Sequence, residues 1–184
     1  MTRMPSQPPL RLRPYQQADA EVLAGWYHLA GASCRTVGIA ASETVAAGGD
    51  AWFALGNHSL PEALPVLRQG NPGLQMLMLN GTPVGFLSAE MRQVPVDPVL
   101  WLRILLVDPA WRRRGIGRAA FSQLLSLPAA PIRLARRVML AVDGENTAGY
   151  AFWRALGFED QLVMPGTCDA ARTVRILAMP VRRA

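Results

Sequence analysis

The chain has 184 residues, of which 51% are apolar, and a formal net charge of +6. This length suits one domain with a real core, and the apolar share argues against disorder. All basic residues are arginine, which excludes both a lysine Schiff base and a P-loop lysine. Because the arginines are scattered, apart from one run at residues 112–114, we expect no nucleic-acid partner.

Membrane, export and metal-binding patterns give no signal in the sequence. The most apolar stretch, residues 98–107, contains Arg103 and is too short to cross a bilayer, so we expect no membrane partner. The first residues lack the apolar centre of a signal peptide, and a cytoplasmic protein is therefore expected. Cys34 and Cys168 stand apart from each other and from any histidine cluster, so we expect neither a disulfide framework nor a metal site.

The first part of the chain predicts a mixture of ordered and irregular segments. Pro14 stops an alternating stretch, and Asp19 is placed to cap a helix. We expect a flexible tail over residues 1–9, an edge strand over 10–13, a helix over 20–31, and an irregular segment over 32–73 with short helices around 41–47 and 61–69.

The rest of the chain has clearer signals. Asn80-Gly81 predicts a hairpin turn, and Gly157 the end of a helix. We expect strands over residues 74–79, 84–92 and 99–107, a helix from about 115 to 126, a strand over 136–142, a helix over 147–156, and strands over 158–164 and 173–181. This order predicts a single mixed α/β (α+β) domain, with one mostly antiparallel sheet of about six to seven strands flanked by helices.

The turn between Val107 and the helix near Gly115 has the features of an anion site. The first N–H groups of a helix lack intrahelical acceptors and lie at the positive end of its dipole. Gly115 and Gly117 allow close approach of a ligand to the backbone. Arg112, Arg113, Arg114 and Arg118 add positive charge. The pattern predicts a phosphate or pyrophosphate site. The alternative is an ordinary helix start with solvated arginines.

Two sequence blocks resemble the GNAT superfamily of acyl-CoA-dependent N-acyltransferases. RRRGIG, residues 112–117, is similar to the family signature (Q/R)xxGx(G/A), and the block from Asn146 to Phe158 resembles its second motif, which ends in LGF. The resemblance covers residues 74–164. It implies a splayed sheet within one domain over 10–184. In that domain, residues 10–73 would form the acceptor side, 74–164 the acetyl-CoA core and 165–184 a closing strand.

The resemblance also implies how acetyl-CoA would be held, with no metal involved. Backbone groups of Leu105, Leu106 and Val107 would pair with the pantetheine arm. The pyrophosphate would lie on the motif that begins at Arg112, against the backbone N–H groups of Arg113, Arg114, Gly115, Ile116, Gly117 and Arg118. Asn146 would contact the pantetheine or adenosine side, and it is equally well placed to cap a helix. The two roles are compatible.

The expected acid and base are less clearly marked. Trp153 stands where many family members have a proton-donating tyrosine, and Ala141 where the branch that acetylates ribosomal proteins has a glutamate. Tyr150, one turn earlier, is the candidate acid, with a wall aromatic as its alternative. Glu90 is the candidate base, with an arginine-paired strand carboxylate as its alternative. Asp143, Glu145, His28 and His58 are weaker candidates.

Taken together, the resemblance implies an N-acetyltransferase that transfers the acetyl group of acetyl-CoA to a primary amine by direct attack. The acceptor would be an amine of a small molecule or of a protein. Trp26, Tyr27, Trp52 and Phe53 would line its cleft or pack in the core. The alternative is a CoA-binding sensor or interaction module of the same fold that has lost catalysis. Edge strands near the C-terminus are compatible with a homodimer.

Overall fold

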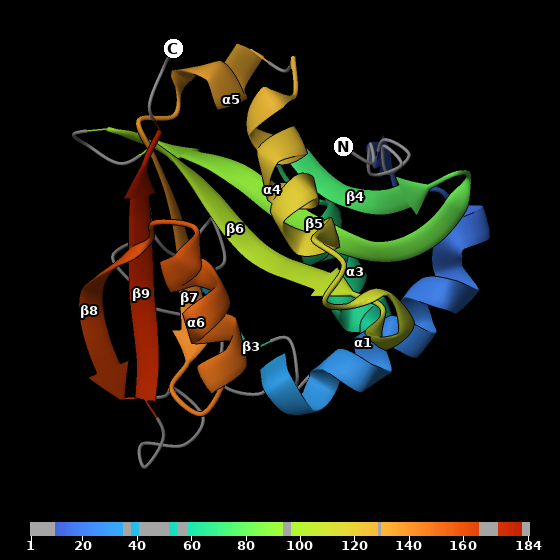
Figure 1. The fold of residues 1–184 in the computed structure, drawn as a ribbon, viewed down its shortest axis with the longest axis horizontal. Coiled ribbons are helices and arrows are strands. Elements are labelled where there is room, and N and C mark those ends of the chain that lie inside the picture. The colour runs from blue at the N-terminus through green and yellow to red at the C-terminus, as the bar shows by residue number, and fades with distance from the viewer. Residues whose placement is uncertain are drawn as a thin grey trace, which may run out of the picture.

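The computed structural model describes residues 10–34, 38–40, 52–54, 59–93, 97–128, 130–165 and 173–181. A seven-stranded sheet in the order β1-β4-β5-β6-β7-β9-β8 forms its centre, and a separate two-stranded sheet pairs β2 with β3 (Figure 1). The strands of the main sheet are β1 (Arg11–Pro14), β4 (Pro72–Leu79), β5 (Thr82–Gln93), β6 (Pro98–Val107), β7 (Arg137–Asp143), β8 (Glu159–Pro165) and β9 (Thr173–Pro180). The smaller sheet holds β2 (Gly38–Ala40) and β3 (Trp52–Ala54).

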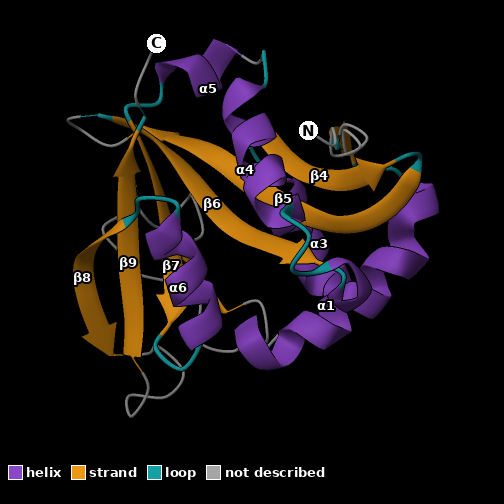
Figure 2. Cartoon of the chain, viewed as in Figure 1, coloured by secondary structure: helices purple, strands orange, loops and turns teal. Residues whose placement is uncertain are grey.

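Helices cover both faces of the main sheet (Figure 2). They are α1 (Ala20–Cys34), α3 (Leu60–Arg68), α4 (Ile116–Ser126), α5 (Ala130–Leu134) and α6 (Thr147–Ala155), with short 3-10 turns η1 (Gln17–Asp19) and η3 (Pro109–Trp111). Side chains of α4, α5 and α6 pack on one face, and side chains of α1 and α3 pack on the other. We call these the α4–α6 face and the α1–α3 face.

The fold agrees with the predicted element order. Asn80 and Gly81 turn between β4 and β5 with φ of 52° and 82°, as the hairpin pair predicted. Gly157, with φ of 94°, follows α6 as the expected left-handed cap. Helix α1 continues past the expected end near Gly31 to Cys34. The sequence signals did not predict α5 or the pair β2–β3, which are short elements. Residues 1–9 and 41–47 lie outside the described residues.

Strand β6 contains a bulge near its middle, at Arg103. On β5, Ser88 pairs with Ile104 and the next residue, Ala89, pairs with Leu102, so Arg103 is the extra residue. The side-chain directions change accordingly. Leu100 and Leu102 contribute to the core of the α4–α6 face, as Leu105 and Val107 do after the bulge, whereas Ile104 and Leu106 join the α1–α3 face.

The sheet splays next to this bulge. β6 runs parallel to β7, and their recorded pairing joins Val99–Leu102 to Arg137–Leu140 and no further. Beyond it the two strands diverge (Figure 1). Across the described residues, the last part of β6 is thus paired with β5 alone, and one edge of its backbone faces the gap beside β7. The predicted splayed sheet is confirmed.

Candidate functional site

The start of α4 is an open helix N-terminus directly after the splayed end of β6. Gly115 is its N-cap residue, with a left-handed φ of 77°, and no side chain caps the helix. A Cβ at Gly115 would meet no atom within 4 Å. The N–H groups of Ile116, Gly117 and Arg118 occupy the first helical positions, where no intrahelical acceptor is available. Open space, unpaired donors and the dipole together suit an anion.

The loop that leads to this helix is held in a specific shape. Asp108 accepts a hydrogen bond from the Ala110 N–H at 2.8 Å and so caps η3, while its own N–H donates to the Val84 carbonyl at 2.9 Å. Arg113 has a φ of 62°, a left-handed conformation that is rare outside glycine. A non-glycine residue held in this conformation is a form of strain that concentrates at ligand sites.

The arginine side chains of the motif make local contacts around the loop. Arg112 donates through Nε to the Val107 carbonyl at 3.0 Å, and Arg118 donates to the Ala155 carbonyl at 3.4 Å. The Arg114 guanidinium lies 5.0 Å from the centre of the Trp111 ring. These arginines are exposed. They surround the helix start with positive charge and leave the backbone donors of α4 open.

The predicted pantetheine-pairing residues lie on the free edge of β6, immediately before this loop. Leu105 and Val107 pack against the α4–α6 face, and Leu106 is buried on the other face. The Leu106 carbonyl faces β5, as the Asp108 N–H does, and because backbone groups alternate along a strand, those of Leu105 and Val107 face the gap beside β7. The carbonyl of Val107 already accepts the Arg112 bond, so it has one acceptor position in use.

Gly117 has a packing role that the sequence did not reveal. A Cβ added at Gly117 would lie 3.1 Å and 3.3 Å from two ring atoms of Phe152 on α6. The glycine therefore lets α4 and α6 approach each other. Substituting it would disturb this contact as well as any ligand, so Gly115 is the better position at which to test anion binding.

Asn146 caps α6. Its side-chain oxygen accepts a hydrogen bond from the Gly149 N–H at 2.8 Å, which confirms the capping role. Asp143 is buried at the end of β7, where its side chain accepts from the Glu145 N–H at 2.9 Å. Glu145 is exposed. The side chains of Asn146 and Asp143 thus accept hydrogen bonds from backbone N–H groups at the start of α6.

Tyr150 lies on α6 and reaches toward the edge of the sheet, away from the gap between β6 and β7. Its hydroxyl donates to Asp160 on β8 at 2.6 Å, and Arg175 of β9 lies 5.1 Å from its ring centre. The bond to the carboxylate stabilises the protonated phenol and raises the pKa of Tyr150. The same bond, with help from Arg175, lowers the pKa of Asp160.

Trp153 is part of the hydrophobic core of the α4–α6 face. It is 9% exposed, and its ring contacts Phe121 and Phe158 at centroid distances of 5.8 Å and 5.2 Å. The position that resembles the family's tyrosine therefore holds a packing residue that cannot donate a proton in acid catalysis.

Glu90 lies on the opposite face of the sheet from Tyr150, so the two catalytic candidates are not brought together. Its carboxylate is buried and forms ion pairs with Arg92, at 2.7 Å, and with Arg103. Arg103 also donates to the Gln69 carbonyl at 2.9 Å. An arginine inside an apolar strand was the sequence signal for this cluster.

Trp26 makes a long-range contact that the sequence did not predict. Its indole N–H donates to the Asp108 carboxylate at 2.9 Å and so joins α1 to the loop before α4. Trp26 and Tyr27 are buried and pack in the core of the α1–α3 face. His28 is exposed on α1, and His58 lies outside the described residues, as do the side chains of Trp52 and Phe53.

Comparison with known proteins identifies the family. Residues 21–158, most of the chain, match the model of the acetyltransferase (GNAT) family. The chain belongs to the GNAT family. An uncharacterized N-acetyltransferase of Methanocaldococcus jannaschii is 31% identical over 104 residues, which are 55% of this GNAT chain and 45% of that protein. The chain thus spans about half the length of this curated relative.

Solved structures share the GNAT fold of the chain. Ard1 from Thermoplasma volcanium superposes with a TM-score of 0.64 and 17% identity, over 95% of this chain and 99% of that one. Arabidopsis thaliana Naa50, solved with the bisubstrate analogue CoA-Ac-MVNAL, gives a TM-score of 0.61 and 14% identity, over 92% and 97%. At these identities the likeness shows a common fold.

Among the residues that the structure describes, no group of three or more histidine, cysteine, aspartate or glutamate side chains is arranged to hold a metal ion. Within the same residues, no helix combines the length and the apolar character needed to cross a membrane.

Proposed function

We propose that this GNAT chain is an N-acetyltransferase that uses acetyl-CoA and acetylates a primary amine by direct attack. The observation that carries the proposal is the uncapped N-terminus of α4, placed directly after the free backbone edge of β6. A long ligand with a pyrophosphate in its middle matches this pair of features: an anion site joined to an unpaired strand edge.

Each residue of the site has a defined task in this proposal. The N–H groups of Ile116, Gly117 and Arg118 bind the pyrophosphate, and Gly115 leaves room for it. The exposed Arg112, Arg113 and Arg114 attract the polyanion without having to touch it. The backbone groups of Leu105 and Val107 on the free edge of β6 align the pantetheine arm as an added strand. Asn146 contributes by fixing the start of α6.

The chemistry rests mainly on positioning. When bound, acetyl-CoA supplies the thioester that an amine attacks. The chain holds the acyl donor along β6, so that the amine meets it in a fixed orientation, and such alignment supplies a large part of the rate in bimolecular reactions. Tyr150 and Glu90 both have other partners through their acidic or basic atoms, which favours a mechanism with little side-chain acid–base help.

The acceptor amine belongs on the α1–α3 side of the gap. Residues 10–73 supply α1 and α3, which cover that face. An amine of a small molecule and an amino group of a peptide are both compatible with this side. That Naa50 was solved with a CoA-linked peptide analogue makes peptides a reasonable first choice of acceptor to test.

A second candidate function is CoA binding without catalysis, as in a sensor or interaction module. Trp153 favours it, because the position that commonly supplies a proton in the family is occupied here by a buried indole. In that case the ligand would stabilise the protein, and acetyl transfer would not follow.

Calorimetry and thiol release separate these functions. Micromolar binding of acetyl-CoA to the wild-type protein, accompanied by a rise in Tm, supports the cofactor assignment. Release of free CoA thiol in the presence of a panel of amines and short peptides, above the rate without protein, supports the enzyme. Binding without thiol release for any acceptor would favour the sensor, and absence of binding would refute both.

A further inference from the structure

The bulge residue of β6, Arg103, is buried among polar partners at the point where the sheet splays. It is 5% exposed and follows Leu102, the last residue of β6 that pairs with β7. Its guanidinium forms an ion pair with Glu90 of β5, which is 3% exposed. The extra residue of the strand thus has its side chain tied to the neighbouring strand.

The contacts of Glu90 are complete on both carboxylate oxygens. Oε2 faces Arg103, and Oε1 lies 2.7 Å from the Arg92 guanidinium. Gly70 packs directly over this side chain, because a Cβ at Gly70 would lie 2.6 Å from the Cβ of Glu90. The carboxylate is therefore fully engaged inside the fold.

Glu90 supplies the counter-charge that stabilises the buried guanidinium of Arg103. Burial lowers the pKa of Arg103 to about 10, while the negative charge of Glu90 acts in the opposite direction and favours the charged guanidinium. An isolated guanidinium in the same place would lack a counter-charge and would be driven toward solvent. A guanidinium that left this site would take the bulge residue with it.

The bulge decides the orientation of everything that follows on β6. Because side chains alternate along a strand, losing the extra residue would turn Leu105 and Val107 to the opposite face. It would also shift the backbone groups that border the gap beside β7. The position of that free edge therefore depends on keeping Arg103 in the bulge.

We propose that Glu90 and Arg103 form a positioning pair, which holds the bulge in β6 and so sets the backbone edge that Leu105 and Val107 offer to the pantetheine arm. This inference rests on the proposed acetyl-CoA site. It gives Glu90 a task that differs from that of a base: the carboxylate acts through Arg103 and the strand, and it does not touch the acceptor.

The test replaces the pair by apolar residues, Glu90→Leu with Arg103→Met. Removing both charges together leaves neither member of the Glu90–Arg103 pair as an unpaired buried charge, and such replacements are often close to neutral for stability. Arg92 loses its Glu90 partner but is partly exposed and keeps its contact with the Trp101 ring. The affinities of two ligands are then measured by calorimetry. CoA uses both the strand edge and the start of α4, whereas ADP carries the pyrophosphate without the pantetheine. We expect CoA affinity to fall about tenfold, the equivalent of one or two hydrogen bonds, and ADP affinity to stay within about twofold.

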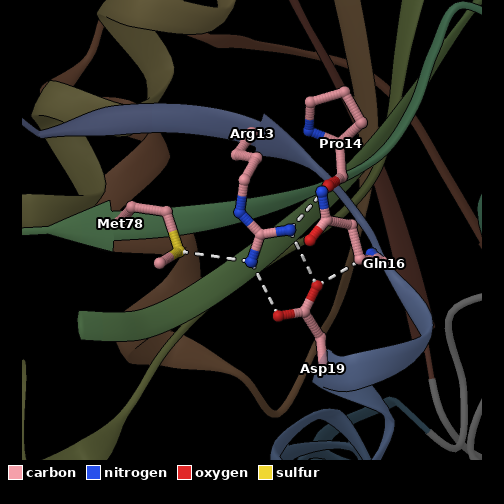
Figure 3. Close-up of polar contacts among 5 residues, drawn as sticks. All are labelled: Arg13, Pro14, Gln16, Asp19 and Met78. Atoms are coloured by element: carbon pink, nitrogen blue, oxygen red, sulfur yellow. Dashed lines mark hydrogen bonds and ion pairs between the residues drawn. The ribbon is translucent and has the colours of Figure 1, made fainter. Parts of the chain in front are cut away.

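A matched control is available at the edge of the sheet. Arg13 of β1 forms a two-bond ion pair with Asp19, at 2.7 Å and 3.0 Å, and Asp19 also accepts from the Gln16 N–H (Figure 3). Strands β4 and β5 separate β1 from β6. The variant Arg13→Met with Asp19→Leu removes an ion pair that is more exposed than Glu90–Arg103, and it should leave the affinities for both CoA and ADP unchanged.

Several results would overturn the proposal. One is a double variant that binds CoA as the wild type does; another is an equal loss of CoA and ADP affinity. Glu90→Gln, which nearly keeps the side-chain shape, is measured as well and serves if the double variant does not fold. Should it keep CoA affinity and lose about a hundredfold in kcat, Glu90 would be a base and the positioning role would be wrong. Failure of the wild-type protein to bind CoA would instead refute the proposed function itself.

Discussion

The two helices that carry the family motifs begin in opposite ways. Helix α4 starts at Gly115 with no side-chain cap and with exposed arginines around it. Helix α6 starts at Asn146, whose side chain accepts the Gly149 N–H, next to the buried Asp143. Both starts follow a strand that borders the same gap, β6 or β7.

The difference shows which helix start is available to a ligand. The orphan N–H groups of a helix must find an acceptor in the protein, in water or in a ligand. At α6 the protein supplies one of these acceptors itself. At α4 it supplies no side chain and leaves open space above a left-handed glycine. We therefore expect substitutions at α4 to change binding and substitutions at α6 to change stability.

The largest effect is expected at Gly115. Gly115→Asp should weaken CoA binding by on the order of a hundredfold, because it places a negative charge and extra atoms where the pyrophosphate is proposed. Gly115→Asn is the matched control. Asparagine has the same size, and both residues tolerate a positive φ better than most. Calorimetric titration with CoA measures both variants. If Gly115→Asp and Gly115→Asn weaken binding equally, charge plays no part and the anion site is misplaced.

Asn146→Ala tests the other helix start. Loss of the cap should lower the free energy of unfolding by about 1 kcal/mol, as measured by chemical denaturation. Asn146→Ser, which keeps a capping oxygen, should recover most of this loss. Below the Tm, CoA affinity should change less than it does in Gly115→Asp. A strong loss of CoA affinity in a stably folded Asn146→Ala protein would show that this amide contacts the ligand.

Arg113 allows the strain in the α4 loop to be measured. Its left-handed φ costs an L-residue roughly 1–2 kcal/mol, so Arg113→Gly should raise the free energy of unfolding by about 1 kcal/mol. The same change removes a positive charge, and CoA affinity should fall by a few-fold at low salt. Arg113→Gln, which removes the charge but keeps the left-handed φ, separates the two effects. A less stable Arg113→Gly protein would contradict the strain.

Tyr150→Phe should have the smallest effect on catalysis. The hydroxyl donates to Asp160, so we expect kcat to change far less than the hundredfold or more that general acid catalysis typically contributes. Its raised pKa can be followed directly: the difference in ultraviolet titration between wild type and variant should show a phenol that ionises above pH 10, the ordinary tyrosine range. A loss of about a hundredfold or more would establish Tyr150 as the acid.

The sequence contained the information for the element order and for the open helix start. Alternating apolar strands, the Asn80-Gly81 turn and the glycines at 115 and 117 depend on local chemistry, and all were readable. What could not be read depends on contacts between distant residues. The bond from Trp26 to Asp108 joins residues 82 positions apart. The packing of Gly117 on Phe152, and the pairing of Arg103 with Glu90, likewise require the fold to be known first.

The Trp26–Asp108 bond has a consequence for how the two substrates bind. The carboxylate that caps the loop before α4 also holds the indole of α1, a helix of the proposed acceptor side. A ligand that orders this loop therefore also restrains α1. Since thermodynamic coupling is reciprocal, we expect each of the two substrates to alter the affinity for the other by the same factor. Titrating CoA with and without a saturating acceptor tests this, and Trp26→Phe should reduce the coupling. The binding of either substrate would then prepare the protein for the other.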